Sequence, residues 1–345
     1  MEFPEVHVFD FGASEQEASR DLAEHLAARQ IESPFILTSV HGETLASELQ
    51  GSRAPQIHVA DSTQRTAAEL GSSAKRSGAD AIVAIGGGRC LDVAKLAAAR
   101  AGLSVVVVPT QLSHDGICSP VAVVPDMDGK PESLGAVAPR FVYLAMPTLV
   151  TAPVASVAAG IGDLLANPLA LRDWALATDR GHEEVSQRAW DLSVESFELI
   201  EPTLDTDPAV LANDPAFHRH LADALVLSGM AMISSGTSRP ASGGEHEISH
   251  ALDELHGGLA MHGAQVAFGC IVSVALYGED TDAFRARLRR LGLPEHPKDL
   301  GLGEQQMVET LLHAPQTRPG RFTIIEDADL DRTSATALVR RVWPE

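Results

Sequence analysis

Short apolar runs alternate with amphipathic, alanine-rich segments over the first 150 residues of the chain. We predict helices from the amphipathic segments at 63–76 and 91–101, and strands from the apolar runs at 35–38, 56–59, 81–85, 104–108 and 141–145. Strands that alternate with helices are typical of a parallel sheet with helices on both faces.

The strand pattern stops after Pro153, and long helical windows follow. We predict helices there at 160–177, 182–199, 218–234 and 263–276. Before that point, VAVVPDMDGKPES has the turn dipeptide Asp128–Gly129 and predicts a protruding hairpin. The chain therefore divides into an α/β domain with a parallel sheet, residues 1–152, and an all-α domain, residues 153–345. A junction of this kind forms a cleft that is suited to small ligands.

Composition narrows the possible environments and partners. A chain of 345 residues that is 45% apolar can bury a substantial core. A net charge of −21 opposes binding to nucleic acid or to anionic membrane surfaces. The three cysteines lack CxxC spacing, and the acidic N-terminus MEFPEVHVFDFG lacks a signal-peptide pattern, so we expect reduced thiols and a cytoplasmic location. The uncharged stretch 141–162 contains Pro147 and Pro153, which favours buried structure over a membrane span.

Three glycines follow the strand at 81–85, and RCLDVAK then opens a helix. Gly86, Gly87 and Gly88 allow the backbone to approach a ligand closely, and the free N–H groups of the helix start favour a pyrophosphate. A glycine turn without a ligand is the alternative. Leu91 stands where GxGxxG would have its third glycine, so the standard dinucleotide fingerprint is absent. The loop PTQLSHDGICSP lies at the carboxyl end of the next strand, where open α/β sheets bind ligands.

Four histidines lie close together in SGGEHEISHALDELHGGLAMHG. A catalytic Zn²⁺ site takes three protein ligands and keeps one open position, which His246, His262 and a carboxylate could supply. Asp163, the single acid of an uncharged stretch, is the candidate carboxylate, with helix capping as its alternative. His250 lies one turn after His246 and is a candidate further ligand or general acid/base. We expect His256 at the surface or behind the ligand residues, and we expect His218 and His220 on an exposed helix face.

The segments GGGRCLDVAK, PTQLSHDGICSP, GIGDLLAN, SRPASGGEHEISHALD and HGAQVAFG occur in an order that resembles the sn-glycerol-1-phosphate dehydrogenases. These enzymes belong to the superfamily of iron-containing alcohol dehydrogenases and dehydroquinate synthase. The similarity runs from about residue 80 to 270, and RPGRFTII adds a weaker C-terminal match. It implies an N-terminal dinucleotide-binding domain and a C-terminal helical metal domain, with homo-oligomers (dimers or larger) as the usual assembly.

The resemblance also implies site residues. Asp163, His246 and His262 match the metal ligands, and Asp115 matches a residue between the nicotinamide and the substrate. The positions that match cofactor-binding residues are Gly86, Gly87, Gly88, Asp92, Thr110, Ser113, Asp115 and Ser119. Asn167 stands where iron enzymes carry a further histidine, which favours Zn²⁺ over Fe²⁺ or Ni²⁺. Arg89 and Ala264 replace the usual Lys and Glu and put the exact substrate in doubt.

The predicted reaction is NAD(P)H-dependent reduction of dihydroxyacetone phosphate. NADH and NADPH both remain open, because the second strand ends in LTSV without an acid for the ribose. Arg239 and Asn167 are the candidates for the substrate phosphate, and His250 or a water is the proton donor. Three alternatives remain: a dehydrogenase of another polyol, phosphonate or cyclitol; a cyclase like dehydroquinate or inosose synthase, which the four lysines disfavour; and a non-catalytic descendant.

Overall fold

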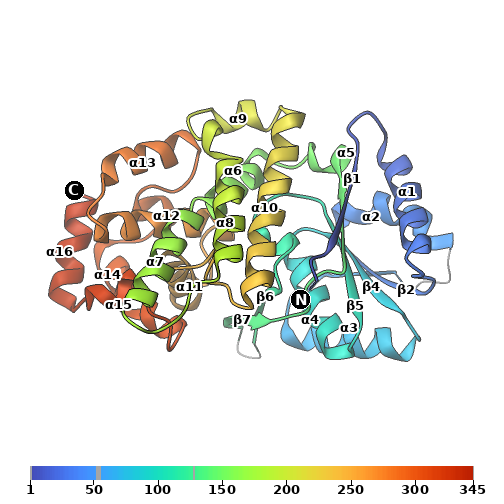
Figure 1. Ribbon diagram of the computed structural model, residues 1–345, viewed down its shortest axis with the longest axis horizontal. Helices are drawn as coiled ribbons and strands as arrows, with labels where there is room; N and C mark the ends of the chain where they lie inside the picture. The colour runs from blue at the N-terminus through green and yellow to red at the C-terminus, as the bar shows by residue number, and fades with distance from the viewer. Residues whose placement is uncertain (1, 52–55, 127–128, 345) are drawn as a thin grey trace.

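The computed structural model describes residues 2–51, 56–126 and 129–344. Within these ranges the N-terminal part contains a six-stranded parallel sheet in the order β1-β8-β5-β4-β2-β3. Its strands are β1 (Glu5–Phe9), β2 (Pro34–Thr38), β3 (Gln56–His58), β4 (Ala81–Gly86), β5 (Ser104–Pro109) and β8 (Phe141–Ala145). A separate antiparallel hairpin is formed by β6 (Val121–Pro125) and β7 (Pro131–Gly135). Figure 1 shows the sheet at the right and the C-terminal helices at the left.

The predicted parallel sheet is confirmed, because each predicted strand pairs in parallel with its neighbours. Strand β1, which pairs along its whole length with β8, was not predicted from the sequence. The inner strands β2, β4, β5 and β8 are buried on both faces because successive side chains enter two different cores. Val83 and Val106 pack on one face with α1 (Glu15–Ala28), whereas Ala84 and Val107 pack on the other with α3 (Gln64–Arg76) and α4 (Gly88–Ala101). The hairpin also forms as predicted, although Asp128 of its turn lies outside the described residues.

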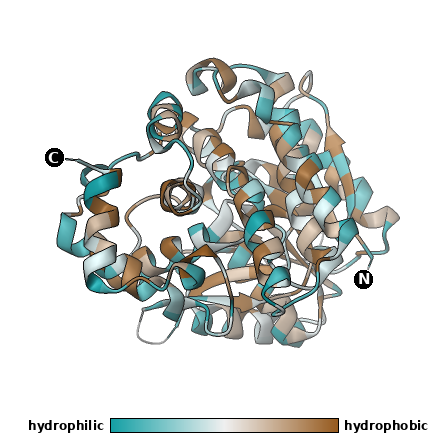
Figure 2. Cartoon of the chain, turned by 60° about the vertical axis from the view of Figure 1, so that its left-hand side comes forward, coloured by the Kyte–Doolittle hydropathy of each residue, from teal (hydrophilic) through white to brown (hydrophobic). Residues whose placement is uncertain are grey.

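No strand follows Ala145 in the part of the chain that the structure describes. The later helices, some of them a single turn, are α5 (Met146–Leu149), α6 (Val154–Leu164), α7 (Asn167–Asp179), α8 (Gln187–Glu198), α9 (Pro208–Leu211), α10 (Pro215–Ser235), α11 (Gly244–His256), α12 (His262–Leu276), α13 (Thr281–Arg290), α14 (Glu304–Thr317), α15 (Ile324–Ala328) and α16 (Arg332–Val342). Figure 2 shows hydrophobic residues gathered toward the interior, with hydrophilic ones on the outer faces of the helices. The predicted α/β region followed by a helical region is therefore present, and the division at residue 152 stays a prediction.

Three predictions on the helices were wrong. The segment 160–177 is two helices, because Pro168 has no N–H and fits the first turn of a new helix, α7. Residues 182–186 are not helical. Tertiary contacts hold them instead, since His182 stacks on Phe322. His218 is fully buried on α10 rather than exposed, with its ring Nδ1 at 3.1 Å from the carbonyl of Asp214.

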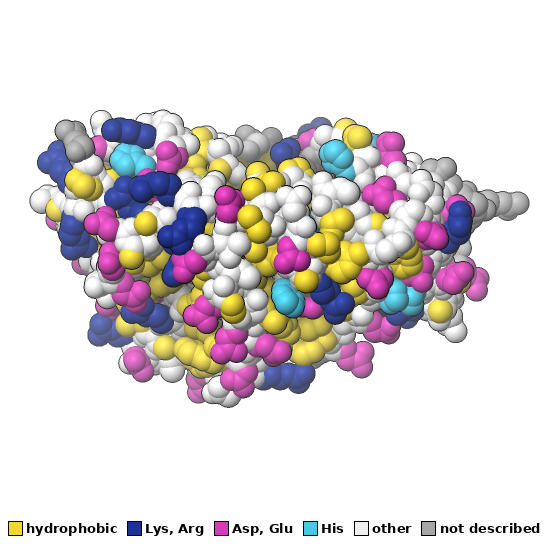
Figure 3. Space-filling model, turned by 90° about the horizontal axis from the view of Figure 1, so that it is seen from above, with side chains coloured by type: hydrophobic (Ala, Val, Ile, Leu, Met, Phe, Trp, Pro, Cys, Tyr) yellow, Lys and Arg dark blue, Asp and Glu magenta, His cyan; other side chains and the backbone are white. Residues whose placement is uncertain are grey.

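The run Val154–Asp179 is long and apolar enough to cross a membrane by length and composition alone. Of its most apolar 18-residue window, 83% is buried inside the protein, which is the pattern of core helices. Cys90, Cys118 and Cys270, which all lie in the described ranges, are buried free thiols, as expected. On the face drawn in Figure 3, acidic side chains are scattered among basic ones rather than gathered in one patch.

Candidate active site

Asp163, His246 and His262 come together from three different helices, α6, α11 and α12. One potential ligand atom from each lies within 4.8 Å of the others. Asp163 Oδ1 is 3.9 Å from His246 Nε2 and 3.7 Å from His262 Nε2. Asp163 lies near the end of α6 rather than at its start, so it does not cap that helix. The structure therefore brings together the three residues that the sequence singled out as metal ligands.

The burial and the protonation of Asp163, His246 and His262 are suited to binding a divalent cation. Asp163 is 4% exposed, and its Oδ1 has no hydrogen-bond donor among the described residues. Burial and the nearby charge of Asp115 raise the pKa of Asp163 well above its usual value. Burial also lowers the pKa of both histidines far below the usual value, which keeps their nitrogen lone pairs available. A cation would compensate the buried carboxylate and occupy the unsatisfied oxygen.

A second layer of contacts orients His246. Its Nδ1 lies 2.9 Å from Glu245 Oε1, which also accepts a hydrogen bond from the Gly243 amide. Metal-binding histidines commonly donate their other ring N–H to a carboxylate, which fixes the tautomer. This contact directs Nε2 of His246 toward Asp163. Glu245 was not predicted as a site residue, although its position directly before His246 is a visible signal.

Close helix packing places His262 against Asp163. A Cβ added to Gly263, at the start of α12, would lie 1.9 Å from the carbonyl oxygen of Ala159 on α6. It would also lie 2.9 Å from the carbonyl oxygen of Ser113. Only glycine allows the backbones of α6 and α12 to approach this closely. The neighbouring His262 thereby reaches the carboxylate on α6.

We expect Gly263→Ala to separate α12 from α6 and to lower both the stability of the protein and the metal affinity of the candidate site. Overpacking of this kind costs about 1–3 kcal/mol of unfolding free energy, and more when backbone atoms must move. Thermal melting and zinc content of the purified variant measure the two effects. Gly12→Ala is the matched control, because an added Cβ there would meet nothing within 4 Å. A Gly263→Ala protein with the melting temperature and zinc content of Gly12→Ala would contradict the packing argument.

The loop after β5 joins the sheet to the three candidate metal ligands. The amide of Asp115 donates to Asp163 Oδ2 at 2.9 Å, and Ser228 on α10 donates to Asp115 Oδ2 at 2.9 Å. Burial raises the pKa of Asp115 to about 6. His114, which the sequence analysis did not single out within this loop, has its ring centroid 5.8 Å from that of His262. The predicted nicotinamide-side residue thus lies directly beside the predicted metal ligands.

The glycine turn lies next to this loop at the carboxyl edge of the sheet. Gly86 ends β4, and its carbonyl accepts a hydrogen bond from the Thr110 amide at 3.0 Å. A Cβ on Gly88 would come within 2.2 Å of the His114 ring, so the loop packs directly on this glycine. Thr110, Ser113 and Ser119 are all buried in the same loop. The predicted cofactor residues therefore share one edge, and their contact with a dinucleotide remains a prediction.

Asp92 has a structural partner that the sequence analysis did not recognise. Lys95, fully buried one turn later on α4, lies 3.0 Å from Asp92 Oδ1. Its ammonium also donates to the carbonyls of Gly116, Ser119 and Val121. Asp92 Oδ2 accepts from the Val123 amide at 3.2 Å. This pair attaches the loop and the hairpin to the helix that follows the glycine turn.

The two residues predicted for the substrate phosphate are already engaged elsewhere. Arg239 is fully buried, its Nε and Nη2 donate to the carboxylate of Glu183, and its Nη1 donates to the Phe322 carbonyl at 2.8 Å. These contacts use the donors that a phosphate would need, so the geometry argues against the predicted role of Arg239. Asn167 donates to the hydroxyls of Ser196 and Ser228, which places it one hydroxyl away from Asp115.

His250 faces an arginine that was not predicted as a site residue. Nη2 of Arg318 lies 2.9 Å from His250 Nε2, and the ring of His250 is 6.3 Å from that of His262. Burial and the charge of Arg318 lower the pKa of His250 well below its usual value. Since an arginine can only donate, His250 accepts at Nε2 and is neutral. Arg318 belongs to RPGRFTII, the weaker C-terminal match in the sequence.

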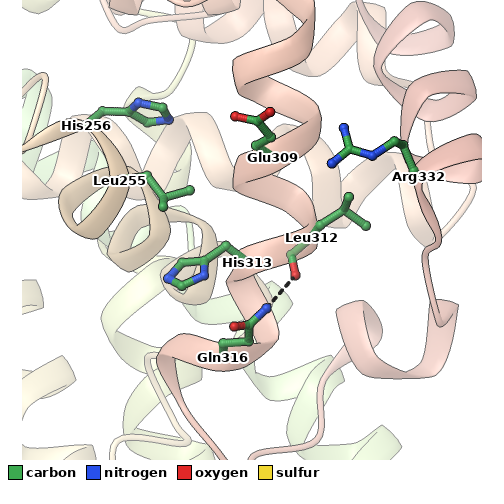
Figure 4. A pocket seen from close by; sticks show the side chains of 7 residues that line it. All are labelled: Leu255, His256, Glu309, Leu312, His313, Gln316 and Arg332. Atoms are coloured by element: carbon green, nitrogen blue, oxygen red, sulfur yellow. Dashed lines mark hydrogen bonds between the residues drawn. The ribbon is translucent and has the colours of Figure 1, made fainter.

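His256 lies apart from this cluster, as expected. Its Nε2 is 3.0 Å from the Thr310 hydroxyl. It lines a surface pocket of about 360 Å³ between α11, α14 and α16, together with Leu255, Glu309, Leu312, His313, Gln316 and Arg332. Figure 4 shows these side chains around the pocket, where the side-chain amide of Gln316 donates a hydrogen bond to the Leu312 carbonyl. None of the predicted site residues lines it.

Comparison with solved structures identifies the class of this fold. The probable glycerol dehydrogenase from Sinorhizobium meliloti 1021 superposes with a TM-score of 0.78 at 20% identity, over 99% of this chain and 97% of that one. Maleylacetate reductase from Agrobacterium tumefaciens gives a TM-score of 0.73 at 19% identity, over 99% and 97% of the two chains. Residues 13–153 match the family model of iron-containing alcohol dehydrogenase. The fold is therefore that of the iron-containing alcohol dehydrogenases.

Sequence comparison defines the family more narrowly. The glycerol-1-phosphate dehydrogenase [NAD(P)+] of Hyperthermus butylicus is 34% identical, over 99% of this chain and 97% of its own length. The enzyme of the same name from Cenarchaeum symbiosum is 38% identical, over 75% of this chain and 71% of its own. The chain belongs to the glycerol-1-phosphate dehydrogenase family. The predicted family and fold class are thereby confirmed.

Proposed function

We propose that this protein reduces dihydroxyacetone phosphate to sn-glycerol 1-phosphate with NADH or NADPH, at a Zn²⁺ site formed by Asp163, His246 and His262. The observation that carries the proposal is the unsatisfied, buried oxygen of Asp163 facing two neutral histidines. Membership of the glycerol-1-phosphate dehydrogenase family supports the reaction. Three protein ligands leave a position open for substrate, as in catalytic zinc sites.

When bound, Zn²⁺ supplies a Lewis acid that polarises the C2 carbonyl and stabilises negative charge on its oxygen. The chain's own residues hold the reactants in place. Glu245 directs the ring of His246, and the amide of Asp115 fixes the carboxylate of Asp163. The glycine turn and the loop 109–120 offer backbone amides and hydroxyls to the cofactor. A bound nicotinamide cofactor would supply the hydride, and one proton would complete the alcohol.

Zinc content and cofactor oxidation together test this proposal. Purified protein is assayed for bound zinc and then for NADH and NADPH oxidation with dihydroxyacetone phosphate, before and after chelation. We expect turnover that chelation abolishes and zinc restores, with sn-glycerol 1-phosphate as the product. Zinc-bound protein that consumes neither cofactor would refute the substrate assignment. Substrate conversion without net cofactor consumption would point to cyclase chemistry instead.

We also propose that the enzyme works in the cytoplasm as a homo-oligomer on a small phosphorylated substrate. The net charge of −21 and the three free, buried cysteines support this environment. Light scattering of the purified protein measures the assembly, and a monomeric mass at micromolar concentration would refute the oligomer.

A further inference from the structure

Two arginines follow α14 in the sequence and lie beside the histidine cluster. Nη1 of Arg318 donates to the Ser238 hydroxyl at 3.1 Å, and Nη2 donates to the Ser133 hydroxyl at 3.2 Å. Nη2 of Arg321 donates to the same Ser238 hydroxyl at 2.9 Å. Nη1 of Arg321 donates to the carbonyl of Ser242 and approaches its hydroxyl at 3.4 Å. The two guanidinium groups therefore share one hydroxyl oxygen and are immediate neighbours.

This pair of cations lacks a direct counter-ion. The acceptors of Arg318 and Arg321 are hydroxyls, one carbonyl and the neutral ring of His250. No carboxylate of the described residues lies within ion-pair distance of either guanidinium, whereas Arg239 next to them is paired with Glu183. Burial and repulsion from Arg318 and Arg239 lower the pKa of Arg321 to about 10. An anion bound here would reduce the repulsion between the guanidinium groups and would supply the negative charge that they lack.

The arginine pair also lies at the right place relative to the metal cluster. Arg318 contacts His250, whose ring neighbours that of His262. In a three-carbon keto-phosphate, three bonds of about 1.5 Å separate the carbonyl carbon from phosphorus. A substrate whose carbonyl lies at the histidine cluster would thus carry its phosphate about three bonds further, in reach of the neighbouring arginine pair. Both arginines are only partly buried, so solvent and ligand can reach them.

We propose that Arg318 and Arg321, together with the hydroxyls of Ser133 and Ser238, form the subsite for the phosphate dianion of the substrate. This inference rests on the proposed function, which it deepens by naming the phosphate-binding residues. Guanidinium groups match phosphate through paired N–H donors, and serine hydroxyls can rotate to donate to it. Ser133 comes from the β6–β7 hairpin, so the N-terminal part of the chain would complete a subsite carried mostly by loops between the C-terminal helices.

Substitution of Arg318 tests the subsite. We expect Arg318→Ala to raise the KM for dihydroxyacetone phosphate about 10- to 100-fold, because charge-assisted hydrogen bonds are lost. Arg318→Lys keeps the charge but not the paired donors, so it should give a smaller rise. The loss should be larger with dihydroxyacetone phosphate than with unphosphorylated dihydroxyacetone, and the zinc content should match that of the wild type. Arg285→Lys is the matched control, since this partly buried arginine on α13 is paired with Glu295 outside the site.

Calorimetry with inorganic phosphate separates this inference from the proposed function. Phosphate binding that Arg318→Ala abolishes supports the subsite even if the wild type does not turn over dihydroxyacetone phosphate. An unchanged KM in both Arg318 variants of an active, folded enzyme overturns it. Wild-type protein that neither binds phosphate nor discriminates between phosphorylated and unphosphorylated ketone overturns it as well. Melting temperatures near wild type confirm that each variant is folded.

Discussion

Asp163→Asn is expected to abolish zinc binding and ketone reduction while leaving the metal-free protein as stable as wild type, or more stable. Asparagine has the same shape, so the Asp115 amide keeps an oxygen acceptor at 2.9 Å. The substitution removes a buried charge, which is costly without a cation. It also removes the one carboxylate of the three-ligand cluster. A rate loss of at least about 10³-fold follows, since metal activation of a carbonyl contributes several kcal/mol.

Zinc content, turnover and thermal melting in chelator measure the three parts of this prediction. Asp253→Asn is a suitable control, because Asp253 is a partly buried carboxylate on α11 bound to Gln265 and outside the metal cluster. Burial raises the pKa of Asp253 as it does that of Asp163. The control should keep its zinc and its activity. One zinc per chain in Asp163→Asn, or a large loss of metal-free stability, would contradict the proposed role of Asp163.

Lys95→Met is expected to cost about 3–5 kcal/mol of unfolding free energy, the usual penalty for removing one partner of a buried ion pair. Asp92 is only 7% exposed and would lose its cation. The carbonyls of Gly116, Ser119 and Val121 would lose the ammonium donor that holds the loop against α4. Because that loop carries Asp115, activity should fall together with stability.

Urea unfolding of Lys95→Met and of the double variant Lys95→Met/Asp92→Asn measures this effect. The double variant should recover part of the loss, since it no longer buries an unpaired carboxylate. Lys75→Met is the control, because Lys75 is exposed on α3 and should change stability by less than about 0.5 kcal/mol. Equal unfolding free energies for Lys95→Met and Lys75→Met would show that the buried pair does not fix the loop.

The sequence alone determined the fold class, and it predicted the three candidate metal ligands that the structure brings together. Parallel strands buried on both faces leave continuous apolar runs such as AIVAIG, which are visible without any structure. The missed strand β1, EVHVF, is an edge strand with exposed and half-buried residues, so its apolar pattern is diluted. The break before α7 was readable from Pro168 but was obscured by the apolar residues on either side of it. His246 and His262 stood out because histidine is rarely repeated at such density in one short segment.

Only the tertiary structure decided which polar side chains pair with each other through hydrogen bonds or ion pairs and which remain available to a ligand. Arg239 and Arg318 are both followed by a proline in the sequence, and the shorter sequence distance to His246 favoured Arg239. In the fold, Arg239 is paired with the carboxylate of Glu183, 56 residues away in the sequence. Arg318 instead contacts the ring of His250, which is 68 residues away in the sequence. Lys95 likewise found its carbonyl partners in a loop 21 to 26 residues further along. Periodicity and local motifs depend on neighbours within a few residues, but ion pairing depends on contacts that exist only after the helices have packed.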